Sequence, residues 1–278
     1  MKKRTLLITG CSSGIGFDGA MTLSKRGWRI LATCRQEKDC TRLQEMGLES
    51  FVLDYASKES IMEGFEEAMS RTDGSLYGLF NNGAHGLMAA VEDIPVEALR
   101  EIFEVNFFGY HELTKLVIPV MRKQGYGRIV QNSSILGFIG VPWRGAYTAT
   151  KFALEGLTDT LRIELRNTGV HVSLIQPGPI GTKFRVNARR HFAKWIDWEN
   201  SPFADDYKNH LIPRLYKENG KKDVFELPPS SVTKVLIHAL ESKRPKEKYR
   251  VTFPTKFMAS IKRVLPTSAI DSILARQL

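Results

Sequence analysis

Cysteine is scarce in this chain of 278 residues, which contains Cys11, Cys34 and Cys40 and no others. An odd number cannot pair completely, and the spacings match neither a CxxC pair nor a zinc pattern. We therefore expect a reducing compartment, the cytoplasm, and no disulfide framework. The six histidines show no ligand spacing either, so we expect no metal.

Long hydrophobic runs are missing as well. No stretch approaches the roughly 20 apolar residues that span a bilayer, and the run Leu6-Leu7-Ile8 is too short for a signal peptide. Apolar residues still make up 42% of the chain and charged residues 25%, which is typical of a globular protein with a substantial core. We expect one soluble domain, residues 1–278.

Negative charge is in short supply, because 30 Asp and Glu stand against 40 Lys and Arg, for a net charge of +10. This balance favours anionic ligands such as nucleotide phosphates, nucleic acid or anionic lipid, and a solvated basic surface explains it equally well. Nucleic-acid binding predicts basic residues on one face. Here they are spread along the chain, with mild enrichment at 183–194 and 243–263, so we expect no nucleic-acid partner.

Apolar runs of strand length alternate with helical patterns along the chain. The predicted strands are 4–9, 28–34, 49–53, 76–80, 127–133, 170–176 and 249–253. The predicted helices lie near 15–26, 58–71, 96–123, 147–167 and 230–243. Because parallel strands need crossover connections, the alternation predicts an α/β, Rossmann-type, doubly wound parallel sheet of about seven strands with helices on both faces.

One segment, residues 184–228, is polar, basic and aromatic and breaks this rhythm. Its large aromatic residues are Trp195, Trp198, Phe203, Tyr207 and Tyr216. The segment follows the sixth predicted strand, and ligands of open α/β sheets bind outside the carboxyl ends of the strands. We therefore expect it to cover a substrate site; the alternative is a surface insertion.

A glycine-rich turn follows the first predicted strand and opens a helical pattern, with the sequence Thr9-Gly10-Cys11-Ser12-Ser13-Gly14-Ile15-Gly16. Glycines let backbone N–H groups approach a pyrophosphate closely, and the following helix directs its N-terminal donors at the same anion. Its place in the first strand–helix–strand unit distinguishes it from an ordinary turn. The predicted ligands of a dinucleotide cofactor here are Gly10, Ser12, Ser13, Gly14, Ile15 and Gly16.

The end of the second predicted strand bears on the choice of cofactor. A site that prefers NAD usually has an acidic residue about 20 positions after the glycines, but no Asp or Glu occurs between Asp18 and Glu37. Arg35 is available instead, and a guanidinium can grip a 2′-phosphate that a carboxylate would repel. We therefore predict NADP(H), with a solvent-exposed arginine as the alternative.

Tyr147 and Lys151 lie four residues apart in a predicted helix, so their side chains share a face. A phenol is a poor acid–base catalyst at neutral pH, and a nearby ammonium would lower its pKa towards the useful range. Such a pair alone carries little weight. Its context is Ser133-Ser134, at the end of the fifth predicted strand.

Six motifs in order complete this context: TGCSSGIG, NNGA at 81–84, Asn106 in VNFFG, NSS at 132–134, YTATK at 147–151 and PGPIGT at 177–182. Together the chain resembles the short-chain dehydrogenase/reductase family over essentially its whole length. It is most similar to the bacterial NADP-dependent aldehyde reductases that resemble retinol and 17β-hydroxysteroid dehydrogenases. The family order is NNAG, so Gly83 and Ala84 are exchanged here, and the loop is expected to differ in shape.

The resemblance implies catalytic roles for four residues. Tyr147 would be the general acid in reduction and the base in oxidation, and Lys151 would lower its pKa and bind the nicotinamide ribose. Ser134 would hydrogen-bond the substrate oxygen. Asn106 would anchor a water that links the lysine to solvent.

The resemblance also implies further cofactor contacts. Asp54 would contact the adenine, and Asn81 would lie beside the adenosine. The segment Pro177 to Thr182 would border the nicotinamide, with contacts from Pro177, Gly178, Ile180 and Thr182. An arginine directly after the second strand is the family feature linked to NADP, which agrees with the charge argument for Arg35.

The predicted function is an NADPH-dependent reductase that interconverts aldehydes or ketones and alcohols. The aromatic residues of 184–228, with a second wall of Phe138, Val141 and Trp143, favour lipophilic substrates. Two alternatives are a dehydrogenase that works in the oxidative direction and a protein that senses NADP(H) without turnover. All of Ser134, Tyr147 and Lys151 are present, which argues against the sensor.

The C-terminal segment 255–278 is basic and amphipathic, and Pro266 would interrupt a single helix there. It could lie on an anionic membrane surface, or dock on the domain or on a partner subunit. By resemblance, we also expect a homodimer or homotetramer that pairs through helices 96–123 and 147–167.

Overall fold

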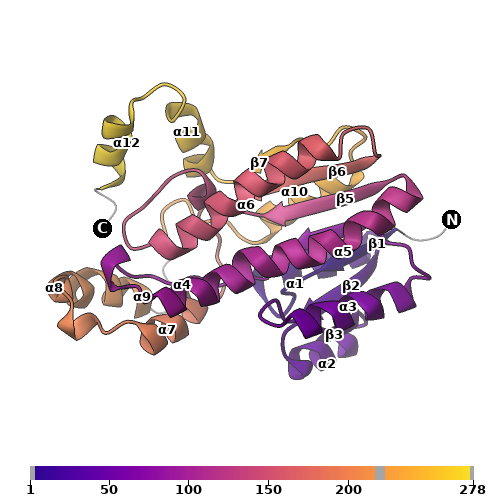
Figure 1. Cartoon of the computed structure of the whole chain (residues 1–278), viewed down its shortest axis with the longest axis horizontal. Helices are drawn as coiled ribbons and strands as arrows, with labels where there is room; N and C mark the ends of the chain where they lie inside the picture. The colour runs from indigo at the N-terminus through magenta and orange to yellow at the C-terminus, as the bar shows by residue number, and fades with distance from the viewer. Residues whose placement is uncertain (1–3, 217–222, 276–278) are drawn as a thin grey trace.

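The computed structural model describes residues 4–216 and 223–275 (Figure 1). Within them, seven strands form one sheet in the order β3-β2-β1-β4-β5-β6-β7, and neighbouring strands are parallel throughout. The strands are β1 Thr5–Ile8, β2 Arg29–Cys34, β3 Glu49–Val52, β4 Gly78–Asn81, β5 Gly127–Asn132, β6 Val170–Gln176 and β7 Lys248–Arg250. The predicted Rossmann-type parallel sheet is confirmed.

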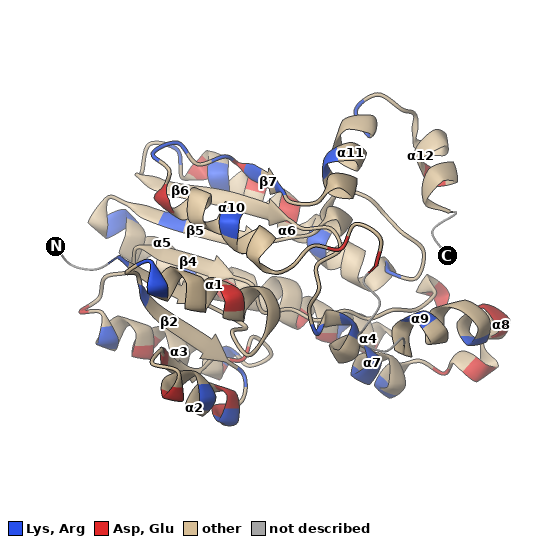
Figure 2. Cartoon of the chain, turned by 180° about the vertical axis from the view of Figure 1, so that it is seen from behind, with Lys and Arg blue, Asp and Glu red and all other residues tan. Residues whose placement is uncertain are grey.

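Both faces of the sheet are buried by helices, as the continuous apolar run of β1 requires. Leu6 and Ile8 pack in one apolar cluster with α1 (Gly14–Lys25) and α10 (Ser230–Glu241). Leu7 points the other way, into a cluster with α3 (Lys58–Arg71), α5 (Gly109–Gln124) and α6 (Gly145–Glu164). Figure 1 shows the second face, and Figure 2 shows α1 and α10 from behind.

The helices differ from the sequence prediction in two places. Helix α2 (Glu37–Glu45) was not predicted, because only Cys40 and Leu43 of its residues are buried and its apolar pattern is short. The predicted helix 96–123 is divided into α4 (Val96–Phe103), a π-helical turn (Glu104–Phe108) and α5. Such π-helical turns often mark functional sites.

The segment 184–228 forms a separate group of short helices beside the carboxyl ends of the strands (Figure 1). They are α7 (Phe184–Trp195), a 3₁₀ turn (Trp198–Asn200), α8 (Ala204–Asp206), a π-helical turn (Tyr207–Leu211) and α9 (Ile212–Tyr216). Residues 217–222 of this predicted covering segment lie outside the described residues. Tyr207 of this segment is fully buried, in an apolar cluster that the segment shares with the loop after β4, with α4 and with the start of α6.

Two helices, α11 (Phe253–Ile261) and α12 (Thr267–Leu274), form the C-terminal segment. Pro266 directly precedes α12, so the predicted interruption is present. Residues 276–278 of the predicted segment lie outside the described part of the chain. Across the described ranges, no helix combines the length and the hydropathy that a bilayer span requires.

Candidate active site

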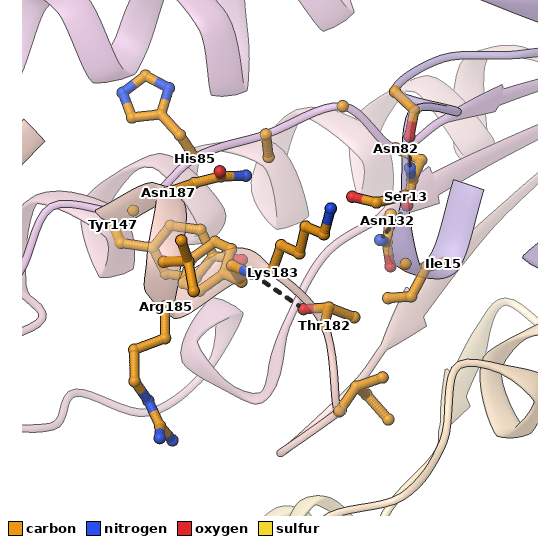
Figure 3. Close-up of a pocket in the computed structure, with 18 of the residues that line it drawn as sticks. Ser13, Ile15, Asn82, His85, Asn132, Tyr147, Thr182, Lys183, Arg185 and Asn187 are labelled. Carbon is orange, nitrogen blue, oxygen red and sulfur yellow. Dashed lines mark hydrogen bonds between the residues drawn. The ribbon is translucent and has the colours of Figure 1, made fainter. Parts of the chain in front are cut away.

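A cavity of about 1710 Å³ opens at the carboxyl ends of the strands. Its residues come from the turns that follow strands β1 to β6 and from helices α2, α4, α6, α7 and α9. Figure 3 shows side chains from segments far apart in the sequence around this space, with Ser13 and Asn82 on one side and Tyr147, His85 and Asn187 on the other. Its position is the one that open α/β sheets use for ligands.

The glycine-rich turn lines the cavity through Gly10, Ser12, Ser13, Gly14 and Ile15. Gly10 and Gly14 have φ of +68° and +60°, which glycine adopts without strain. The side chain of Ser13 makes no cap hydrogen bond at the start of α1. The first N–H groups of α1 are therefore not satisfied by a side-chain cap and suit a phosphate ligand.

Gly16 does not line the cavity, which corrects the prediction that it binds the cofactor. A Cβ atom at this position would lie 2.4 Å from the carbonyl oxygen of Gly10. Gly16 is therefore required so that α1 can pack closely on the preceding turn.

Basic side chains meet at the end of β2. Arg35 lines the cavity, and so do Lys38 and Arg42 from α2. Arg42 donates a hydrogen bond to the carbonyl oxygen of Ser12, which ties α2 to the glycine-rich turn. Sequence reasoning missed Lys38 and Arg42; the signal was two basic residues, four positions apart, just after Arg35. All three suit a 2′-phosphate by charge.

Asn81 is the second correction. Its side chain is fully buried, donates to the hydroxyl of Thr114 and the amide oxygen of Gln131, and accepts from Tyr55. The next residue, Asn82, lines the cavity instead. Asn81 is the last residue of β4 and its side chain makes its hydrogen bonds within the protein interior, so the structure places Asn82 and not Asn81 at the cavity.

The exchanged residues Gly83 and Ala84 also line the cavity. Gly83 does not have a positive φ. A Cβ atom on Gly83 would lie 3.4 Å from the Gly10 Cα, an ordinary contact. Position 83 therefore has a backbone conformation that residues other than glycine can adopt, and the exchange of Gly83 and Ala84 introduces no strain there. Asp54 lines the cavity after β3, and Pro177, Gly178, Ile180 and Thr182 line it after β6.

Tyr147, Lys151 and Ser134 converge on the cavity from α6 and from the end of β5. Ser134 begins a short 3₁₀ turn, where its hydroxyl accepts from the Leu136 amide at 3.1 Å, and it is hydrogen-bonded to Tyr147. Lys151 is fully buried and donates from Nζ to the Asn132 carbonyl oxygen at 2.8 Å. Its Nζ lies 5.6 Å from the centre of the Tyr147 ring.

The pKa values differ from the sequence-based expectation. Burial raises the pKa of Tyr147 above its ordinary value, and the hydrogen bond from Ser134 opposes this rise. Burial lowers the pKa of Lys151 to about 7, and the charge of Glu155 opposes that change. The expected lowering of the Tyr147 pKa by Lys151 is thus not found: burial raises this pKa, and the group that lowers it is Ser134.

Asn106 lies in the π-helical turn, fully buried and behind the cavity wall. Its side-chain amide donates to the His85 carbonyl oxygen at 2.9 Å and accepts from the His85 N–H at 3.1 Å. A second donation reaches the hydroxyl of Thr150 at 3.3 Å. Asn106 therefore fixes the loop after β4 against α6, and its role in holding a water stays a prediction.

Comparison with known proteins agrees with this arrangement. Residues 4–192 match the model of the short chain dehydrogenase family. The chain belongs to this family of oxidoreductases. It is 39% identical to the protein named uncharacterized oxidoreductase YbbO of Escherichia coli (strain K12), over 98% of this chain and 94% of that one. Identity to human retinol dehydrogenase 8 is 32%, over 87% and 79% of the two chains.

A solved structure of similar shape supports the fold of this short-chain dehydrogenase. The crystal structure of a short-chain dehydrogenase from Streptomyces avermitilis superposes with a TM-score of 0.77. The two sequences are 24% identical, and the match covers 94% of each chain.

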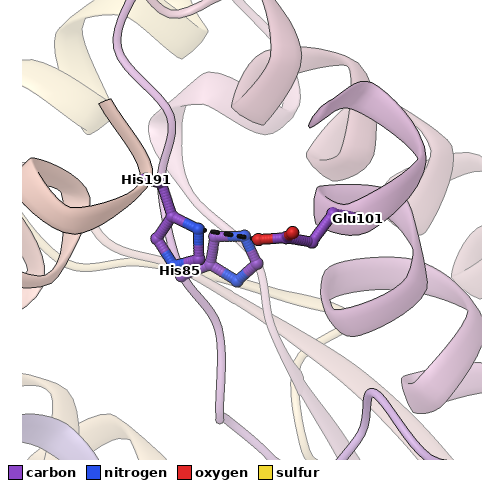
Figure 4. Close-up of side chains that lie close together, drawn as sticks. All are labelled: His85, Glu101 and His191. Carbon is purple, nitrogen blue, oxygen red and sulfur yellow. Dashed lines mark hydrogen bonds and ion pairs between the residues drawn. The ribbon is translucent and has the colours of Figure 1, made fainter. Parts of the chain in front are cut away.

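One cluster in the wall of the cavity was not visible in the sequence. His85, from the loop after β4, stacks on His191 of α7 with ring centres 3.8 Å apart, and Nδ1 of His191 lies 2.9 Å from the Glu101 carboxylate of α4 (Figure 4). The ligand atoms of the three residues lie within 4.8 Å of one another. Lys194 also pairs with Glu101.

The geometry of this cluster differs from that of a metal site. The planes of the two rings are 11° apart, so the rings are stacked. A metal ion lies in the plane of each imidazole that binds it. Two stacked, nearly parallel rings therefore cannot both bind the same ion. The Lys194 ammonium occupies the same carboxylate. The cluster therefore fastens α7, the first helix of the segment 184–228, to α4.

The substrate side of the cavity corrects two further predictions. Of the large aromatic residues in 184–228, Trp195, Trp198 and Tyr207 pack in the apolar cluster that the segment shares with α4 and α6, and they do not line the cavity. Phe138 also lies elsewhere and packs near α11 and α12. The apolar lining near Tyr147 comes instead from Leu87, Leu136, Val141, Trp143, Phe184 and Leu211.

Proposed function

We propose that this protein is an NADPH-dependent carbonyl reductase in which Tyr147 supplies the proton. The observation that carries the proposal is the convergence of Tyr147, Ser134 and Lys151 on one cavity. The cavity also contains the glycine-rich turn and the basic end of β2, so the residues present suit a dinucleotide. When bound, NADPH would supply the hydride that the carbonyl carbon accepts.

The protein's own residues would act on the carbonyl oxygen. Hydride addition develops negative charge on that oxygen, and the hydroxyls of Ser134 and Tyr147 can donate hydrogen bonds to it. Tyr147 would then transfer its phenolic proton to the oxygen. Because burial raises the pKa of Tyr147, the phenol is protonated at neutral pH, as a proton donor in reduction must be.

The glycine-rich turn would hold the pyrophosphate of the cofactor. Arg35, Lys38 and Arg42 would receive its 2′-phosphate, because they are the basic side chains that line the cavity at the end of β2. Asp39 also lines this end and lies 3.5 Å from Arg42. Three basic side chains against one carboxylate leave a net local charge of about +2. This charge favours the 2′-phosphate, so NADPH should bind more tightly than NADH.

The retinol dehydrogenase name of one relative keeps the oxidative direction as a second candidate. Tyr147 would then accept the proton of the alcohol, and the raised pKa favours that step only at high pH. The pH dependence of the two rates therefore distinguishes the directions. The rate of reduction should be maintained at neutral pH, and the rate of oxidation should increase as the pH rises.

The first experiment measures consumption of NADPH and of NADH separately with nonanal, retinal and a ketosteroid. We expect turnover with NADPH, and at least one apolar substrate that is used faster than the others. Tyr147→Phe should lower kcat by roughly 10²–10⁴-fold while NADPH still binds. Faster turnover with NADH would contradict the role of Arg35, and equal turnover by Tyr147→Phe would contradict the proton donor.

The cellular location, the oligomeric state and the membrane contact of the enzyme are also part of the proposal. We propose a cytoplasmic homodimer or homotetramer, by resemblance alone. The C-terminal segment exposes Phe253, Phe257 and Val264 beside the basic residues Lys256 and Lys262, which supports contact with an anionic membrane surface. Sedimentation of the protein with anionic and with neutral vesicles tests this contact.

A further inference from the structure

One cationic side chain lies beside the proposed proton donor without a counter-ion. Arg144 directly precedes α6, three residues before Tyr147, and it lines the cavity. It is partly buried, and its Nη1 donates to the carbonyl oxygen of Trp143 at 3.0 Å. Among the residues that the structure describes, no carboxylate lies within ion-pair distance of Arg144.

The surroundings of Arg144 add positive charge. Burial, followed by the charges of Arg214 and Arg185, lowers the pKa of Arg144 to about 10, and Asp223 acts weakly in the opposite direction. Asp223 is itself paired with Arg185. At neutral pH the guanidinium of Arg144 is therefore charged and lies among like charges, an arrangement that costs free energy unless an anion joins it.

The covering segment adds to this excess. Helix α7 carries Arg185, Arg189, Arg190 and Lys194 and has no acidic residue (Figure 2). Three of these, Arg185, Arg190 and Lys194, line the cavity, as does Arg214 of α9. The substrate side thus combines an apolar lining next to Tyr147 with a cationic wall, a combination that suits an amphipathic ligand and not a purely apolar one.

We propose that Arg144 binds a carboxylate of the substrate, so that the preferred substrates are oxo acids, in which an apolar chain joins the reacting carbonyl group to a carboxylate. The inference rests on the proposed function and narrows its substrate class. A planar guanidinium can hold a carboxylate through two parallel hydrogen bonds. An unsubstituted aldehyde would leave this charge without a partner, which lowers its affinity.

The test compares pairs of substrates that differ only in the carboxylate. The probes are oxo acids of four, six and nine carbons, each measured against the plain aldehyde of the same length, with NADPH. At the length that best spans the site, kcat/KM should favour the acid by roughly 10- to 100-fold, the range of a hydrogen bond to a charged group. Equal or higher kcat/KM for the plain aldehyde at all three lengths would overturn the proposal.

Three variants then test whether the preference for the acid comes from Arg144. Arg144→Met keeps the length of the side chain but removes its charge, and it should bring the ratio of acid to aldehyde close to one. Arg166→Met removes the same charge from an exposed residue just after α6 and should keep the wild-type ratio. Arg144→Lys keeps the charge without the planar fork and should give an intermediate ratio. An unchanged ratio in Arg144→Met would exclude this residue.

A binding measurement separates this inference from the proposed function. Calorimetry with NADPH-loaded protein compares 9-hydroxynonanoate with 1-nonanol, because an alcohol cannot transfer a hydride to a cofactor that is already reduced. If no aldehyde is reduced but the hydroxy acid binds more tightly and Arg144→Met removes the difference, the proposed reaction fails and the carboxylate site stands. If turnover occurs and neither rates nor affinities favour the acid, the reaction stands and the carboxylate site fails.

Discussion

Two walls of the cavity differ in what holds their residues in place. The sheet-edge wall consists of the turns that follow β1, β2, β4, β5 and β6, and the covering wall consists of the lining residues of α7, α9 and the turn between them. Backbone geometry fixes the first wall: Gly10 approaches the loop after β4, and Lys151 is anchored on the Asn132 carbonyl. Residues of this kind tolerate almost no change.

The covering wall is fastened by polar side chains at a few points. Asp93 accepts the hydroxyls of Tyr207 and Ser201, each at 2.7 Å, and Glu101 accepts from His191 and Lys194. Such contacts can change without disturbing the sheet. The difference teaches that the proposed chemistry and the proposed carboxylate site at Arg144 lie on the rigid wall, whereas the wall that can vary adds further basic side chains to the substrate side.

The largest effect is expected from Gly10→Ala in the sheet-edge wall. A Cβ atom at Gly10 would lie 2.6 Å from the Cα of Gly83, and the φ of +68° adds strain. We expect a loss of roughly 2–5 kcal/mol in the free energy of unfolding, from strain and overpacking together. Weaker NADPH binding should accompany it. Urea unfolding and fluorescence titration with NADPH measure both quantities.

Gly27→Ala is the matched control, because Gly27 has φ of +89° but a Cβ atom there would meet nothing within 4 Å. Strain alone should cost roughly 1–2 kcal/mol, and NADPH affinity should be unchanged. Equal losses in the two variants would show that the close approach of the sheet-edge turns contributes nothing.

An intermediate effect is expected from Asp93→Ala in the covering wall. The change removes the acceptor of two hydroxyl groups, one of them from the buried Tyr207, and should cost roughly 1.5–3 kcal/mol. Because the loss falls on the covering wall, proteolysis within 184–216 should accelerate and the KM of the substrate should rise, while NADPH affinity stays constant.

Asp197→Ala serves as the comparison, since Asp197 accepts only the amide of Asn200, three residues further on. It should leave both proteolysis and KM at the wild-type values. A fall in NADPH affinity in Asp93→Ala would mean that the two walls are not separable.

The smallest effect is expected from His85, which follows β4 and stacks on His191 of α7, so that it connects the two walls. Burial, followed by the charge of His191, lowers the pKa of His85 to about 3, and the side chain is 7% exposed. The unfolded chain therefore binds a proton below about pH 6.5 that the folded protein does not bind until about pH 3. Stability from this group is complete above pH 6.5 and is lost as the pH falls towards 3.

Between pH 6 and pH 5 this linkage should cost about 1 kcal/mol. The measurement is urea unfolding at the two pH values for the wild type and for His85→Gln, which should lack this part of the pH dependence. His111→Gln, at an exposed position of α5, should keep it. The same pH dependence in wild type and His85→Gln would show that His85 stays accessible to protons in the folded state.

The amino-acid sequence by itself determined the sheet, the glycine-rich turn and the meeting of Ser134, Tyr147 and Lys151. Each rests on local periodicity or on short motif spacing. Parallel strands also bring the residues that follow them to a single edge, so position along the chain predicts position in space. The family resemblance depended on the same motifs. Asn81 shows where this prediction fails. A shift of one residue along the chain changes whether a side chain is buried against the sheet, like Asn81, or lines the cavity, like Asn82.

Only the tertiary structure decided how the covering wall faces the cavity. Its helices are short, and their aromatic residues follow no clear period, so the sequence did not reveal that Tyr207 packs inward while Arg185 and Arg190 face the site. The cluster of His85, Glu101 and His191 and the unpaired charge of Arg144 depend on contacts between distant segments. Burial, which reverses the expected pKa shift of Tyr147, is likewise a property of the assembled fold.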